Sequence, residues 1–419
     1  RVYWALVIRY CNHLKEELLT PTQESLNFIQ DRYLLHDIPL PEDTDRLLRL
    51  MLVPNKKLDY SDQVWMGLQC LDPTKKPYKV LWCDEAQDLS VLRLEFCLNL
   101  ADCCIFCGDP YQSINAFAGA DFQAFEKVRA VSKNSGGTTL PLKTCFRCPP
   151  NIIERINTIR PARLKAYKKE PGPIERLHIN ELAKRVLQLA NRASGNEIPD
   201  EYCTVCDCNL TRGRADQGTT FSCGCDAPTI EKFDPTIPAV PDCGASLDNY
   251  LMISRTNANL IRAAIALSKH QIPVTIVKRR SDDDNTEEVL TKYFVTHKCT
   301  NIEHLLQSCQ RDLLRADKLP FRQGIVLRDK AECMIHLANS CTSLTQLIPK
   351  LKSFNTNTKG SVKLSTIHKA KGLEFPFVFI LFPPIPHPKA ITENEIEQER
   401  NLQFVAESRT MYYTAFVSE

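Results

Sequence analysis

The chain has 419 residues, of which 43% are hydrophobic and 25% charged, and its formal net charge is +3. This composition is typical of a globular protein with a substantial core, and the length suggests two or three domains. The near-neutral charge excludes a nucleic-acid coat protein, so any nucleic-acid contact must come from local patches. The apolar runs are far shorter than the roughly 20 residues that span a bilayer, so no membrane contact and an intracellular location are expected.

The two ends of the sequence and its thiols add to this interpretation. The opening stretch Arg1 to Ile8 is too short for a signal-peptide core, and the absence of an initiator Met indicates the interior of a longer protein. Most of the 19 cysteines stand singly in apolar runs, as in Cys103 to Cys107. Such thiols behave as small hydrophobic groups, so a reducing compartment is expected.

The pattern of apolar residues changes along the chain. Residues 1–60 have leucines at helical spacing among charges, which predicts helices. Short apolar runs then follow at 79–83 and 103–107, with helical patterns between them. The same pattern returns at 251–254, 274–277, 362–365, 377–381 and 412–416. Alternation of this kind predicts an α/β fold with parallel sheets and crossover helices, in which ligands lie at the carboxyl ends of the strands.

An acid pair follows the first of these predicted strands. Asp84 and Glu85 belong to the sequence Asp-Glu-Ala-Gln-Asp, and two adjacent acids at a strand end point in different directions. One can hold a magnesium ion while the other polarises water, which is the division that phosphoryl transfer needs. An isolated acid pair of this kind is equally often a helix cap with a first-turn acid.

Four later segments bear on that choice, and they follow the acid pair in a fixed order. They are Gly108 to Ile114 with Phe117, then Leu142 to Arg147, then Thr366 to Phe375, and last Gln403 to Arg409. Together with the acid pair, these segments resemble motifs II to VI of the UvrD/Rep-like superfamily 1 DNA helicases. The resemblance runs from about Asp59 to the end of the chain.

The resemblance implies two RecA-like P-loop NTPase domains with helical insertions, which clamp Mg²⁺–ATP and pull single-stranded DNA across them. On this basis we expect the end of a helical subdomain at 1–60, a first RecA-like domain at 61–160 and a second at 161–419. Residues 196–247 are expected to form a cysteine-rich insertion and 281–352 a short helical one.

Site residues are carried over from the motifs. Asp84 would hold magnesium, Glu85 would activate the attacking water, and Gln112 would sense the γ-phosphate. Arg147 and Arg409 would reach the γ-phosphate from the two motor domains, where guanidinium groups offset developing negative charge. The remaining assignments are Glu374 to the ribose, Phe117 to base stacking, and Thr366 and His368 to the DNA phosphates. Among the departures from the family pattern, Cys145 stands where the family usually has Asn.

A cluster of thiols in the insertion at 196–247 is not part of the resemblance. Cys203, Cys206, Cys223 and Cys225 have spacings that suit a tetrahedral zinc site, although the C-x-C spacing is tight for one metal and favours a cysteine-rich loop without metal. Cys208 and Cys243 lie nearby in the sequence.

One motif that such a motor needs, the Walker A phosphate loop, is not found in this sequence. The 419 residues contain no Gly-Lys-Ser or Gly-Lys-Thr, the end of the Walker A loop that cradles phosphates. The first RecA-like domain is therefore expected to be incomplete, with uncovered apolar edges, and this chain alone is expected to hydrolyse no ATP.

The leading hypothesis is an ATP-dependent 3′–5′ DNA helicase acting at duplex junctions in repair, recombination or replication. One alternative is the helicase subunit of a recombination helicase–nuclease, which would need a nuclease domain. The other is a DNA-binding relative that has lost hydrolysis, against which the retained acids and arginines argue.

Overall fold

A computed structural model describes most of the chain. The described residues are 2–33, 35, 37–51, 58–72, 74–114, 124–194, 201–203, 230–232, 241–277, 286–319, 321–354, 359–382, 387, 390 and 393–419. They form two compact units, Arg1–Leu142 and Lys143–Glu419. Among these residues, no helix is both long enough and apolar enough to cross a membrane.

The first unit begins with a helical group, as the leucine spacing predicted. Its helices are α1 (Val2–Glu17), α2 (Gln23–Tyr33), α3 (Pro41–Met51) and α4 (Tyr60–Cys70). Apolar side chains from α1 and α2, among them Leu14 and Ile29, are completely buried in a small core. A buried ion pair between Lys15 and Asp62 joins α1 to α4.

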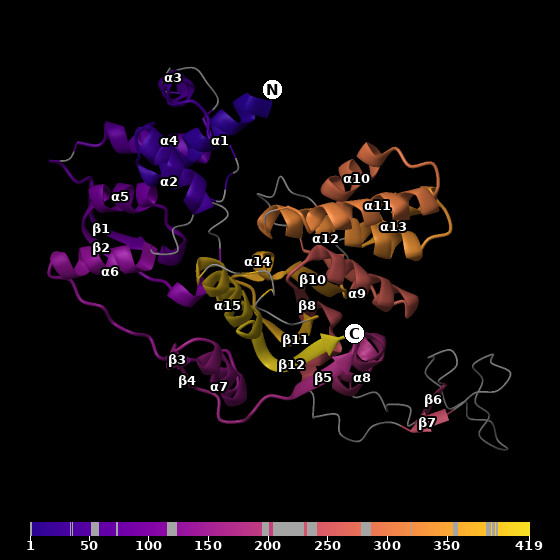
Figure 1. Cartoon of the computed structure of the whole chain (residues 1–419). Helices are drawn as coiled ribbons and strands as arrows, with labels where there is room; N and C mark the ends of the chain where they lie inside the picture. The colour runs from indigo at the N-terminus through magenta and orange to yellow at the C-terminus, as the bar shows by residue number, and fades with distance from the viewer. Residues whose placement is uncertain are drawn as a thin grey trace, which may run out of the picture. The chain divides into compact units, whose positions relative to one another are not determined.

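A two-stranded parallel sheet follows, made of β1 (Tyr78–Cys83) and β2 (Ala101–Phe106). The other helices of this unit are α5 (Val91–Leu100), α6 (Ala124–Asn134), and two 3₁₀ helices, η1 (Ala86–Asp88) and η2 (Pro110–Gln112). In Figure 1, α5 lies above the two strands and α6 below them. Tyr78, Val80 and Trp82 of β1 are 59%, 50% and 72% exposed.

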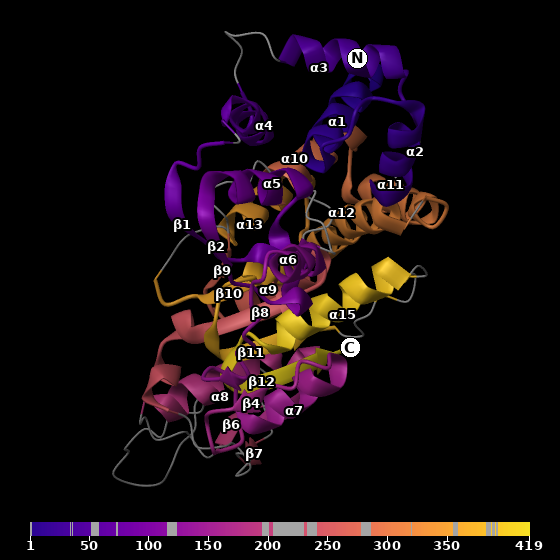
Figure 2. The same cartoon turned by 90° about the vertical axis from the view of Figure 1, so that its left-hand side faces the viewer.

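The second unit is built on a six-stranded sheet with the order β5-β12-β11-β8-β10-β9, in which every pairing is parallel. Five of its strands lie where the sequence predicted them: β8 (Tyr250–Ser254), β9 (Val274–Ile276), β10 (Val362–Thr366), β11 (Phe375–Leu381) and β12 (Thr410–Ser418). In Figure 2 these five follow one another in their pairing order. The edge strand β5 (Ile174–His178) had not been predicted.

Helices pack against this sheet and explain its apolar strands. They include α7 (Pro150–Ile159), α8 (Leu182–Ala193), α9 (Asn257–Lys269), α14 (Ile367–Ala370) and α15 (Glu393–Glu407), with 3₁₀ helices at Ile179–Glu181, Asp242–Ala245 and Leu247–Asn249. Every residue of β8 is buried. Strands covered on both faces need such continuous apolar runs, and this confirms the α/β interpretation.

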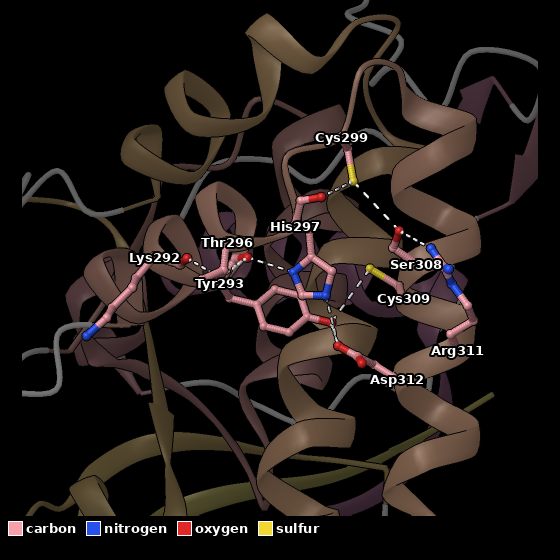
Figure 3. Close-up of polar contacts among 9 residues, drawn as sticks. All are labelled: Lys292, Tyr293, Thr296, His297, Cys299, Ser308, Cys309, Arg311 and Asp312. Carbon is pink, nitrogen blue, oxygen red and sulfur yellow. Dashed lines mark hydrogen bonds and ion pairs between the residues drawn. The ribbon is translucent and has the colours of Figure 1, made fainter. Parts of the chain in front are cut away.

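A helical group lies beside α9 in Figure 1 and covers nearly the stretch predicted at 281–352. It comprises α10 (Thr286–His297), α11 (Ile302–Ala316), α12 (Phe321–Asn339), a 3₁₀ helix at Leu344–Gln346 and α13 (Leu347–Ser353). Asp312 of α11 binds two groups of α10: the Tyr293 hydroxyl at 2.6 Å and His297 Nε2 at 3.0 Å (Figure 3). This polar contact fixes the register of α10 against α11.

The division between the units lies earlier in the chain than the expected domain boundary. Residues 143–160, placed by sequence at the end of the first domain, belong to the second unit. Arg155 binds the Glu407 carboxylate through two nitrogens at 2.8 and 3.0 Å, and Arg160 binds Glu397 and Asn401. These partners are more than 230 positions away, so a local sequence pattern does not reveal them.

Two pairs of short strands complete the unit. β3 (Thr144–Cys145) pairs with β4 (Lys165–Ala166) in parallel, and β6 (Glu201–Cys203) pairs with β7 (Ile230–Lys232) antiparallel. Most of the cysteine-rich insertion expected at 196–247 lies outside the described residues.

Candidate functional site

In the first unit, the polar segments after β1 and β2 lie at the same edge of the sheet. The Cys107 amide donates to the Cys83 carbonyl at 2.8 Å, and the Ala86 amide donates to the Cys107 carbonyl at 2.9 Å. The pairing of the two parallel strands is thus continued past their ends. It brings the acid pair beside the Gly108–Ser113 segment, where ligands of such sheets bind.

Glu85 has an unusual backbone conformation. Its φ and ψ are 54° and 39°, in the left-handed region that a residue with a Cβ rarely adopts. Such strain often accompanies functional positions and persists only where surrounding contacts hold it. Here the Gln87 side-chain amide donates a hydrogen bond to the Glu85 carboxylate.

Gln87 also connects the acid pair to the second segment. Its side chain is 1% exposed, and its Oε1 accepts a hydrogen bond from the Asp109 amide at 3.0 Å. The Ser113 hydroxyl donates to the Gln87 carbonyl at 3.4 Å. A Cβ on Gly108 would lie 2.4 Å from Gln87 Oε1, so a larger residue at this position would displace the Gln87 side chain.

The third predicted residue of this unit, Gln112, lies in η2. Its side-chain nitrogen donates to Asp109 Oδ2 at 2.9 Å, and Asp109 Oδ1 accepts from the Tyr111 amide at 3.0 Å. Gln112 and Glu85 are therefore linked through Asp109 and Gln87. A displacement at one of them can reach the other through two side chains.

Asp84 fits a magnesium ligand by its chemistry and exposure. Its side chain is exposed at the strand end, and Oδ1 accepts a hydrogen bond from the Glu85 amide at 2.9 Å. Mg²⁺ is commonly held by one or two carboxylates with waters and substrate phosphates. No cluster of three or more His, Cys, Asp or Glu suited to a metal occurs within the described part of the chain.

In the second unit, Arg147 and Glu374 form an ion pair. Arg147 Nη1 also donates to the Ser408 carbonyl at 3.3 Å. The ion pair joins the segment between β3 and α7 to the turn before β11. The bond from Arg147 to Ser408 joins the same segment to the end of α15. Two residues predicted to bind nucleotide thus lie together, each in a position to neutralise the other.

Arg409 is in a different environment, because its side chain is buried with only 1% exposed. Its guanidinium donates to the Val405 carbonyl at 2.9 Å, the Leu373 carbonyl at 3.1 Å and the Ser408 hydroxyl at 2.8 Å. The sequence predicted a guanidinium directed at a phosphate. In this structure it ties α15 to the turn before β11, one residue from Glu374.

The predicted DNA-contacting residues lie at the end of β10. Thr366 caps α14, and its hydroxyl accepts a hydrogen bond from the Lys369 amide at 3.4 Å. His368 lies in α14 and is half-buried. Both are therefore at the carboxyl end of a central strand of the second sheet.

Other predicted residues lie outside the described side chains. Phe117 is among them, as are the zinc candidates Cys206, Cys223 and Cys225, and only the backbone of Cys203 is described, in β6. Cys243 is described and exposed.

The predicted residues thus form one group in each unit: Asp84, Glu85 and Gln112 in the first, and Arg147, Glu374 and Arg409 in the second. Two residues near these groups were not predicted: Gln87, which binds Glu85, and Cys148, whose thiol donates to the same Ser408 carbonyl as Arg147. The position of Gln87 inside the Asp-Glu-Ala-Gln-Asp segment was the available signal.

A model of a known protein domain matches a stretch in each of the two units. The UvrD/REP helicase N-terminal domain matches residues 6–132, and the UvrD-like helicase C-terminal domain matches residues 298–413.

Individual proteins match over shorter stretches. The ATP-dependent DNA helicase PcrA of Staphylococcus epidermidis is 46% identical over 59 residues, which are 13% of this chain and 8% of that protein. PcrA of Staphylococcus aureus is 44% identical over 59 residues, again 13% and 8%. The ATP-dependent DNA helicase Rep of Salmonella typhimurium is 32% identical over 84 residues, 18% of this chain and 12% of Rep. The matched stretches span small parts of these relatives.

Proposed function

Because the chain belongs to the UvrD/Rep-like family of DNA helicases, whose two domains are RecA-like P-loop folds, we propose that it is the ATP-driven motor of a helicase. In this proposal it moves 3′ to 5′ on single-stranded DNA and separates duplex strands at junctions. In this proposal the protein acts on genomic DNA during repair, recombination or replication.

The observation that carries this proposal is the arrangement at the ends of β1 and β2. Two exposed carboxylates, Asp84 and Glu85, stand at adjacent positions, and Gln87 holds Glu85 in its unusual conformation. We assign Glu85 to accept a proton from the water that attacks the γ-phosphate. Asp84 would hold Mg²⁺, which offsets charge on the phosphates. Gln112, tied to Asp109, would respond to the phosphate and couple it to DNA binding.

The arginines would supply positive charge to the transferred phosphoryl group. Arg147 is a third exposed and bound to a partner that ATP could replace, whereas Arg409 is buried. We therefore assign Arg147 the direct contact with the γ-phosphate. Arg409 would act on the phosphate only if its bonds to the carbonyls of Val405 and Leu373 exchange. Glu374 would bind the ribose, and Phe117, Thr366 and His368 would bind DNA.

The 419 residues by themselves would not complete this chemistry. They contain no Gly-Lys-Ser or Gly-Lys-Thr to neutralise the phosphates. We infer that this chain alone binds ATP weakly and does not hydrolyse it. DNA-stimulated turnover by the isolated chain at about 1–100 per second, the range of comparable phosphoryl transfer, would show that another phosphate site exists.

Direction and activity can be tested together in a form of the protein that hydrolyses ATP. Partial duplexes with either a 3′ or a 5′ single-stranded tail would be incubated with Mg²⁺ and ATP, and the released strand measured. We expect unwinding of the 3′-tailed substrate and little of the 5′-tailed one. Equal unwinding of both, or preference for the 5′ tail, would contradict the proposed direction. ATP turnover without strand release would leave a translocase rather than a helicase.

A further inference from the structure

Two cysteines flank the arginine that we assign to the γ-phosphate. Cys145 ends β3, Cys148 precedes α7, and the sequence between them is Phe146-Arg147. Both thiols are free. Cys145 is half-buried, whereas Cys148 is 1% exposed. One sulfur can therefore meet a reagent from solution, and the other is reached only from its partner.

The two thiols are in contact. Cys145 accepts a hydrogen bond from Cys148 and others from the backbone amides of Arg147 and Cys148. The Cys148 thiol also lies 3.6 Å from the Ser408 carbonyl, so its single proton has two acceptors within reach. Cys145 and Cys148 are three positions apart with side chains within hydrogen-bonding reach, so a disulfide between them requires no movement of a distant element.

The surroundings favour a thiolate at Cys145. The hydrogen bond from Cys148, the two backbone amides and the positive charge of Arg147 lower the pKa of Cys145 to about 5. The bond to Cys145 and burial raise the pKa of Cys148. The thiolate is the reactive form of cysteine, and a thiol of low pKa is also a good leaving group. A disulfide here would therefore form and be reduced readily.

A second pair of touching thiols differs in its charges. Cys83 of β1 and Cys97 of α5 share a hydrogen bond that lowers the pKa of Cys97, but the charged side chain that acts on Cys83 is the acid Asp84. A carboxylate disfavours a neighbouring thiolate where a guanidinium favours it. The Cys83–Cys97 pair therefore serves as a control in which two thiols interact without a cation that favours the thiolate.

We propose that Cys145 and Cys148 form a redox-active dithiol that exchanges with small-molecule disulfides such as oxidised glutathione. The Cys145 thiolate attacks one sulfur of the disulfide, forms a mixed disulfide and releases the first thiolate. Cys148 then loses its proton and attacks the Cys145 sulfur, releasing the second. Two protein thiols are oxidised to one disulfide, and one small disulfide is reduced to two thiols.

The disulfide would enclose Arg147 in a ring of four residues. Arg147 and Cys148 both donate to the Ser408 carbonyl, and oxidation removes the Cys148 donor. The modification thus acts on the backbone that carries the guanidinium. Its effect on ATP turnover rests on the proposed function, whereas the exchange itself does not.

The exchange can be measured on the 419-residue chain. After incubation with oxidised glutathione, free thiols would be alkylated and peptides analysed by mass spectrometry. We expect a Cys145–Cys148 disulfide that excess reduced glutathione reverses, and no disulfide between Cys83 and Cys97. Cys148→Ser should leave a mixed disulfide with glutathione on Cys145, and Cys145→Ser should leave Cys148 unmodified. A dithiol that stays reduced, or one oxidised no faster than the control pair, would overturn the proposal.

The reactivity of Cys145 gives a second test that does not require the disulfide. Its rate of alkylation by iodoacetamide should stay near its maximum at pH 7 and fall to half near pH 5. Arg147→Gln should move this midpoint upward, and Arg147→Lys should move it less. A midpoint at about pH 8.5, the value of an ordinary thiol, would contradict the proposal even if the variants fold normally.

Discussion

Arg147 forms an ion pair with Glu374, a residue 227 positions later in the chain. The Arg147 side chain is 32% exposed and that of Glu374 48%. Solvent screens a pair of this exposure, so its contribution to stability is at most about 1 kcal/mol. In the proposed function, the guanidinium would have to leave the Glu374 carboxylate before it could bind a phosphate.

The variant Glu374→Gln tests the proposed contact of Glu374 with the ribose. We expect thermal stability to change little, and ATP affinity to fall because the ribose loses its carboxylate partner. Glu397→Gln is the control, since Glu397 pairs with Arg160 instead. A large loss of thermal stability in Glu374→Gln with unchanged ATP affinity would assign the pair a structural role only.

Removal of the Gln87 side-chain amide should impair catalysis and stability together. Gln87→Leu keeps the size but removes the acceptor of the part-buried Asp109 amide, at a cost of about 1–3 kcal/mol. Glu85 also loses its donor, and misplacement of a catalytic group by about 1 Å can lower turnover roughly 100-fold. ATP turnover and urea denaturation would be measured with Asp102→Asn, an exposed surface change, as the control. Turnover equal to that of the control would argue against a positioning role.

Replacement of the proposed general base isolates the chemical step. Glu85→Gln keeps the side-chain size but cannot accept a proton, so ATP turnover should be abolished while ATP-dependent DNA binding persists. The measurement is DNA-stimulated ATPase with a parallel binding titration. Turnover within a few fold of the unmodified protein would remove Glu85 from this role.

Phe117 tests the predicted contact with bases. Phe117→Ala should weaken binding of single-stranded DNA by about 1–3 kcal/mol, because one stacking surface is lost. Hydrolysis should continue while strand separation declines. Unchanged DNA affinity and unwinding would mean that Phe117 is an ordinary apolar side chain.

The cysteine-rich insertion carries a prediction that rests on sequence alone. Cys203, Cys206, Cys223 and Cys225 should bind one zinc ion per chain. Metal analysis of protein purified in reducing buffer without chelator would measure it, and Cys223→Ser should reduce the zinc content. Well under one equivalent in the unmodified protein would leave a loop without metal.

The strands and the residues that follow them could be predicted because their signals are local. A strand covered on both faces needs a continuous apolar run, and β8 and β11 show such runs in the sequence. The edge strand β5 has no such apolar run and was therefore not predicted. Its Ile-Glu-Arg-Leu-His sequence is charged and only partly buried, so no apolar run marks it.

The sequence by itself determined the α/β class, the order of the motifs and the acid pair at a strand end. Tertiary structure alone decided which groups these residues meet. The contact of Gln87 with Asp109 depends on the parallel pairing of β1 with β2, and that of Arg147 with Glu374 on the chain's return after more than 200 residues. The burial of Arg409 and the place of residues 143–160 in the second unit arise in the same way. Local patterns specify backbone conformation, whereas the neighbours of a side chain depend on how distant segments pack.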